Sequence, residues 1–117
     1  MRFTIQPRTL TTANNCAISF VHLGRYGEAK ALLRKTIPAA RRALGEDNRL
    51  TLKMRRFYAR TIYEDKGATL ADLREAVTTL AELERTAQRV LGGAHPTVGG
   101  IEDSLRKARA VLRARET

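Results

Sequence analysis

The chain has 117 residues, the length of one ordinary domain, with 43% hydrophobic residues and a formal net charge of +10 from 22 Lys and Arg against 12 Asp and Glu. The single cysteine, Cys16, excludes a framework of intramolecular disulfides, and the two histidines, His22 and His95, are too far apart in sequence to predict a metal site. No apolar run reaches the roughly 18–20 residues that cross a bilayer, and residues 1–7 lack the apolar stretch of a secretory signal, so we predict a cytoplasmic protein without metal or cofactor.

Apolar side chains recur at three- and four-residue steps along five segments, which predicts amphipathic helices and no strands. We predict helices over residues 9–23, 27–44, 50–65, 70–91 and 97–115, with glycines between them. In the first segment the apolar stripe is formed by Leu10, Ala13, Ala17, Phe20 and Val21. Cys16 is expected to be a small buried residue of this helix.

Two of the predicted helices carry signals at defined positions. Pro38 interrupts the second helix without changing the phase of its apolar stripe, which favours one kinked helix over two short ones. Gly45 is the predicted C-cap of that helix. Thr69 is the predicted N-cap of the fourth helix, with the Asp72 carboxylate three residues later, as in a capping box.

The sequence repeats itself with two different offsets. Residues of the first helix recur 42 residues later, as Thr9, Leu10 and Ala17 do at Thr51, Leu52 and Ala59. Residues of the second helix recur 47 residues later, as Glu28, Ala29, Leu33, Arg42, Leu44 and Gly45 do at Glu75, Ala76, Leu80, Arg89, Leu91 and Gly92. The unit is therefore a helix pair, and its second copy carries five extra residues near the inter-helix turn. We predict one helical-repeat domain over 1–117, with repeat 1 at about 7–47, repeat 2 at about 48–94 and a capping helix at about 95–117.

Three stretches of the first repeat carry a resemblance to a known family. They are Asn14-Asn15-Cys16-Ala17, Leu23-Gly24-Arg25-Tyr26-Gly27-Glu28-Ala29 and Arg41-Arg42-Ala43-Leu44-Gly45-Glu46-Asp47. Together with Leu91-Gly92-Gly93-Ala94-His95-Pro96-Thr97, they resemble tetratricopeptide repeats of the kinesin-light-chain type. The resemblance implies an all-α, right-handed stack of antiparallel helix pairs. Stacking then covers the apolar faces that one pair leaves open, and Ala17, Ala29, Ala59 and Ala76 are small where helices must approach.

No catalytic motif is visible in the sequence. Ser19 and Ser104 lack the glycines of a nucleophile elbow, and no glycine-rich loop precedes a Lys-Ser or Lys-Thr pair. His95 is expected to have a structural role in a turn. The acidic pairs Glu46-Asp47 and Glu64-Asp65 fall at helix ends and are expected to be solvated charges. The sequence therefore favours a protein that is not an enzyme.

The favoured function is the binding of an extended peptide in the concave groove that the first helix of each pair lines. On the first helix, the candidates are Asn14, Asn15, Ile18 and His22, on the face expected to lie away from the apolar stripe. The resemblance implies that asparagines at such positions pair with a peptide backbone. On the third helix, Lys53, Arg56 and Arg60 form one row of cations, which favours an acidic ligand.

The charge is distributed in blocks, and this leaves other functions open. Residues 30–60 hold ten cations and two anions, residues 61–105 hold four cations and eight anions, and residues 106–115 add five cations. Nucleic-acid binding through the basic blocks is the main alternative, although stacking aromatics are not interleaved with them. A third possibility is a structural fragment of a longer repeat array. We predict no membrane association and a monomer, or weak self-association through exposed repeat ends.

Overall fold

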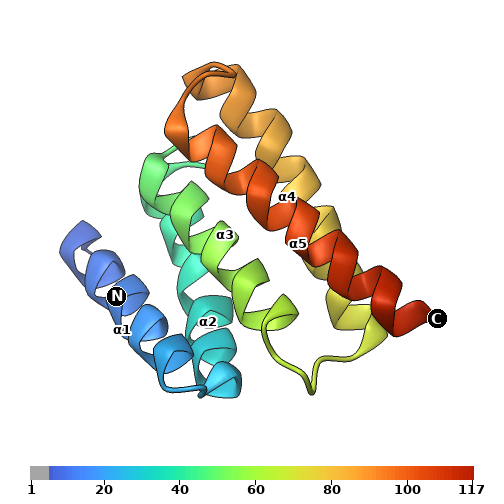
Figure 1. The fold of residues 1–117 in the computed structure, drawn as a ribbon. Coiled ribbons are helices and arrows are strands. Elements are labelled where there is room, and N and C mark those ends of the chain that lie inside the picture. The colour runs from blue at the N-terminus through green and yellow to red at the C-terminus, as the bar shows by residue number, and fades with distance from the viewer. Residues whose placement is uncertain (1–5) are drawn as a thin grey trace.

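The computed structural model describes residues 6–117, which form five α-helices (Figure 1). Each helix begins and ends within two residues of its predicted bounds, and no strand occurs in residues 6–117. The helices are α1 (Pro7–His22), α2 (Tyr26–Leu44), α3 (Arg49–Tyr63), α4 (Leu70–Leu91) and α5 (Pro96–Glu116). The all-α prediction is confirmed. The prediction that residues 1–7 are not a secretory signal falls mostly on residues 1–5, which lie outside the described residues.

The helices stack as antiparallel pairs in chain order, with α1 against α2, α3 against α4, and α5 against α4 (Figure 1). Helix α3 also contacts α1 and α5, while α2 and α4 have no backbone approach to each other within residues 6–117. Because α1, α3 and α5 approach one another and α2 and α4 spread apart, the stack curves toward the odd-numbered helices. We call the side of α1, α3 and α5 the inner face and the side of α2 and α4 the outer face.

The core follows the predicted apolar stripes. Ala17, Ala29, Ala59 and Ala76 are fully buried, which confirms that small residues stand where helices meet. Leucines fill the spaces between them, and full burial of one such side chain is worth about 1.5–3 kcal/mol. The largest fully buried apolar side chains are Leu10, Leu33, Leu52, Met54, Ile62, Leu73, Leu80, Leu83, Val98 and Ile101.

The two connectors between repeats have the same geometry, 47 residues apart. Gly45 and Gly92 end their helices with φ of 91° and 85°, a backbone conformation that suits glycine alone. Asn48 and His95 then cap α3 and α5, because each side chain accepts a hydrogen bond from the backbone N–H two residues later, at 2.9 and 3.1 Å. The structural role predicted for His95 is confirmed.

The second repeat is longer than the first in two places. The turn between its helices spans residues 64–69, against 23–25 in the first repeat, and α4 has 22 residues against 19 in α2. The extra turn of helix starts at the predicted N-cap, since the Thr69 hydroxyl accepts a hydrogen bond from the Asp72 N–H at 3.1 Å. Helix α2 runs on as one element through Pro38, as predicted.

Two expectations about burial are wrong. Cys16 is exposed, not buried. Asn14 is buried, with 6% of its surface exposed, although it was assigned to the face away from the stripe. The buried apolar positions of α1 are Leu10, Ala17 and Val21, and Asn14 continues their spacing. The helix is therefore rotated toward Asn14 and away from Cys16.

Candidate functional site

The four candidates on α1 are divided between core and surface. Asn15 and His22 are exposed, Ile18 is half-buried and Asn14 lies in the buried stripe. The Oδ1 atom of Asn14 is fully buried and has no hydrogen-bond partner in the described part of the chain. A buried amide oxygen without a hydrogen-bond partner lowers the stability of the fold, so Asn14 is a destabilising polar position in the core.

The three cations on α3 do share one face, but two of them have partners within the chain. Lys53 is exposed, and Arg56 donates a hydrogen bond from Nε to the buried Ser104 hydroxyl on α5 at 3.0 Å. Arg60 pairs with Glu64 and lies over the Phe57 ring, 5.3 Å from its centre. These contacts fix the directions of Arg56 and Arg60, which lowers the entropy lost when a ligand binds them.

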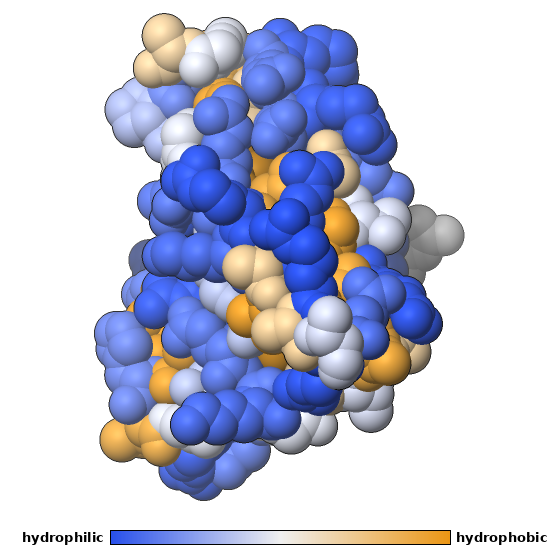
Figure 2. All heavy atoms as spheres, turned by 45° about the vertical axis from the view of Figure 1, so that its right-hand side comes forward, coloured by the Kyte–Doolittle hydropathy of each residue, from blue (hydrophilic) through white to orange (hydrophobic). Residues whose placement is uncertain are grey.

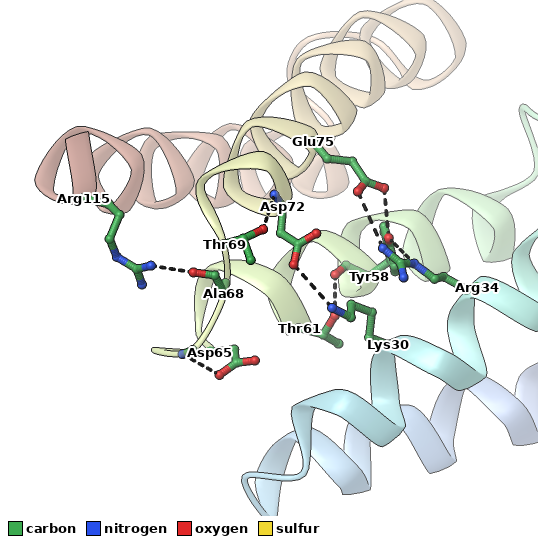
Figure 3. Close-up of polar contacts among 11 residues, drawn as sticks. Lys30, Arg34, Tyr58, Thr61, Asp65, Ala68, Thr69, Asp72, Glu75 and Arg115 are labelled. Carbon is green, nitrogen blue, oxygen red and sulfur yellow. Dashed lines mark hydrogen bonds and ion pairs between the residues drawn. The ribbon is translucent and has the colours of Figure 1, made fainter.

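A chain of polar contacts that the sequence did not predict joins α2 to α4 across α3 on the outer face (Figure 3). Arg34 donates from Nε to the Tyr58 hydroxyl at 2.8 Å, and that hydroxyl donates to Glu75 at 2.9 Å. The Arg34 guanidinium also lies over the Tyr58 ring, 5.7 Å from its centre. Lys30 pairs with Asp72 at 3.5 Å one turn away. We call these contacts, together with those of Arg55 to Glu46 and Glu82, the outer-face row.

Arg55 lies at the end of the outer-face row near the last turn of α2 and is 7% exposed. Its guanidinium approaches Glu46 and Glu82 at 3.5 Å each, while Arg41 binds Glu46 at 2.9 Å. Burial and the nearby Arg41 charge lower the pKa of Arg55 from its ordinary value. Arg55 is therefore a buried cation that no carboxylate approaches closely.

Tyr58, in the same row, has a raised pKa, whereas the pKa of Arg55 is lowered. Burial raises the pKa of Tyr58 above 10, the Glu75 carboxylate raises it further, and the hydrogen bond from Arg34 opposes the rise. The contact with Tyr58 raises the pKa of Arg34. The proton therefore stays on the Tyr58 hydroxyl, which lets that group donate to Glu75 and accept from Arg34.

The acidic pairs at helix ends are not simply solvated, which corrects the sequence prediction. Glu46 pairs with Arg41 and Arg55, Asp47 pairs with Arg89 at 3.2 Å, and Glu64 pairs with Arg60. Asp65 accepts a hydrogen bond from the Gly67 N–H in the long turn at 2.9 Å. The charge blocks of the sequence do not predict these pairs, although they do fit the pairs of Lys30 with Asp72 and of Arg34 with Glu75, which join the basic block to the acidic one.

Figure 2 shows one face of the molecule, on which hydrophilic side chains predominate and apolar side chains appear in patches between them. Within residues 6–117, no helix is both long and apolar enough to cross a membrane, and no group of three or more His, Cys, Asp or Glu side chains could hold a metal ion.

One comparison with known proteins supports the repeat interpretation. Residues 9–49 match the family model of the tetratricopeptide repeat, which covers α1, α2 and the connector after them. No curated protein and no solved structure matches the chain. The match and the stacked helix pairs support a tetratricopeptide-type helical repeat, a kind of repeat that generally serves protein–protein interaction.

Proposed function

We propose that the chain is a non-catalytic module that binds an extended, acidic peptide segment along its inner face. The observation that supports this most directly is the row of Lys53, Arg56 and Arg60 on α3, the helix at the centre of that face. On the neighbouring α1, Asn15 and His22 are exposed and offer donors and acceptors to a peptide backbone. The acidic nature of the ligand and the kinesin-light-chain type of the repeat stay predictions.

The two arginines can bind a carboxylate without first giving up all their existing contacts. Arg56 uses Nε for Ser104, and its Nη atoms remain available as further donors. Arg60 pairs with Glu64, whose side chain is 30% exposed, so an acidic ligand competes with Glu64 for that guanidinium. Ligand binding is therefore expected to be of moderate affinity and to weaken as salt rises.

The test is the double variant Arg56→Glu with Arg60→Glu, measured by fluorescence anisotropy against a library of acidic peptides. The proposal predicts loss of binding with the helical circular dichroism retained. The matched control is Arg42→Glu with Arg85→Glu on α2 and α4, because both residues are exposed and the change in net charge is the same. Peptides with Gln in place of Glu should bind the wild-type chain at least about tenfold less tightly if two charge-assisted hydrogen bonds are lost.

Two results would count against this proposal. If both double variants lose binding equally, the peptides respond to net charge and not to the inner face. If neither loses binding, the peptide site lies elsewhere. The nucleic-acid alternative is tested in parallel by a gel-shift titration against salt, in which steep weakening supports the alternative and no binding near physiological salt dismisses it.

A further inference from the structure

A hollow of about 240 Å³ lies on the outer face, between α2 and α4 and over α3. Three arginines, Arg34, Arg41 and Arg55, share its wall with one acidic residue, Glu75. The volume far exceeds the ~30 Å³ that one water molecule occupies in the liquid. The hollow is thus large enough for a polyatomic group, and its lining is rich in donors that carry positive charge.

The buried cation in this wall lacks a close counter-ion. Charge-assisted hydrogen bonds between guanidinium and carboxylate are about 2.7–2.9 Å long, whereas Arg55 lies 3.5 Å from both Glu46 and Glu82. Those two carboxylates belong to side chains that are 58% and 52% exposed. Water therefore screens them, and the desolvation of Arg55 is only partly compensated.

We propose that this hollow binds a phosphate-type oxyanion, held between the guanidinium groups of Arg41 and Arg55. A phosphoryl group carries nearly two negative charges and three acceptor oxygens, and the planar fork of arginine matches two of those oxygens at once. Arg34 and Arg41 are two turns apart on α2, and Arg55 reaches the hollow from α3, so the donors come from separate directions. A carboxylate has only two oxygens and one charge, and would leave one guanidinium unmatched.

The existing glutamates decide where in the hollow the oxyanion lies. Glu75 is held at one end by Tyr58 and Arg34 (Figure 3), so the oxyanion binds at the other end, beside Arg41 and Arg55. Glu46 does not line the hollow but pairs with both of these arginines, and its exposed side chain can turn into water when a stronger anion binds them. The site is on α2 and α3 and shares no residue with the inner-face row, so it is independent of the peptide groove.

The experiment is a calorimetric titration of the full chain with inorganic phosphate. Arg41→Gln should weaken binding about tenfold through the loss of one charge-assisted contact, and Glu46→Gln should strengthen it several-fold by removing the internal competitor. Arg89→Gln is the matched control, because Arg89 also pairs with a carboxylate, that of Asp47 at 3.2 Å, but lies outside the hollow. Its loss should leave phosphate binding unchanged. Arg55→Lys keeps the charge and loses the fork, and should also weaken binding.

Further arms of the titration identify the source of the oxyanion. A phosphoserine peptide that binds more tightly than free phosphate assigns the site to a phosphorylated partner, and equal affinities assign it to the free ion. Equal phosphate affinity in the wild-type chain, Arg41→Gln and Arg89→Gln overturns the proposal, as does the absence of saturable binding. If acetate or a glutamate peptide binds as tightly as phosphate, the site is not selective for a phosphate-type oxyanion and the proposal is overturned. It is also overturned if an oligonucleotide binds and inorganic phosphate does not. Arg41 and Glu46 are exposed, and thermal unfolding of each variant verifies that its fold is intact.

Discussion

The contact between Arg56 and α5 can be tested with two neighbouring glycines. Gly99 and Gly100 lie in the first part of α5, and alanine at a helical position is favoured over glycine by about 0.5–1 kcal/mol. A Cβ at Gly99 meets nothing within 4 Å, so Gly99→Ala should realise this gain in full. For a domain of this size the gain raises Tm by roughly 2–5 °C.

Gly100→Ala makes the same local change but meets Arg56. Its Cβ would lie 2.6 Å from Nη1 and 3.0 Å from Cζ of Arg56, so the guanidinium must move. We predict that this move costs the hydrogen bond from Nε to Ser104, whose surface is 2% exposed, and a buried hydroxyl left without its partner costs about 1–3 kcal/mol. Gly100→Ala should therefore be between neutral and about 2 kcal/mol less stable than the wild-type chain.

The measurement is urea-induced unfolding followed by circular dichroism, with a cycle that includes Arg56→Met. In the Arg56→Met background the guanidinium is gone, and Gly100→Ala should be as stabilising as Gly99→Ala. A Gly100→Ala chain that gains stability equally with Arg56 present would refute the reasoning, because the guanidinium then would not lie against α5.

Three other predictions follow from contacts and backbone geometry. Folding raises the pKa of Tyr58, so the stability that the protonated hydroxyl contributes is complete below about pH 10 and is lost as the pH rises through the folded-state pKa. The free energy of unfolding measured across alkaline pH should therefore fall, and Tyr58→Phe should make this fall smaller. Gly45→Ala and Gly92→Ala should each cost about 1–3 kcal/mol of backbone strain, and equal losses in urea unfolding would confirm that the two connectors are equivalent. Exposed Cys16 should react with a thiol reagent in the folded chain as fast as in urea, and strong protection would show that α1 is rotated differently.

The sequence predicted the helices well because local signals determine them. Apolar periodicity predicted the five segments, and Thr69 marked the start of the fourth. The two offsets also predicted the extra length of the second repeat correctly, although not its division between the turn and the first turn of α4. These features depend on residues within a few positions of one another, so that a single sequence is enough to find them.

The candidate site was harder to predict because it depends on helix rotation and on distant partners. Asn14 is polar, so its place in the buried stripe of α1 was not apparent, and Cys16 was assigned inward in its stead. Arg55 had the same appearance as its neighbour Arg56, yet one lies on the outer side of α3 and the other on the inner side. The carboxylates of Glu46 and of Glu82, the latter 27 residues away, distinguish Arg55 as part of the outer-face row.

The outer-face row has a further consequence, which concerns the order of the repeats. Helix α2 presents cations such as Lys30 and Arg34 to the acidic residues Asp72 and Glu75 of α4. A second copy of the first repeat, inserted between the two, would bring one α2 beside another and set ammonium and guanidinium groups against their own kind. The two repeats share a fold and a connector, but they are not interchangeable. The charges favour a first-type repeat followed by a second-type repeat, and they disfavour two first-type repeats in a row.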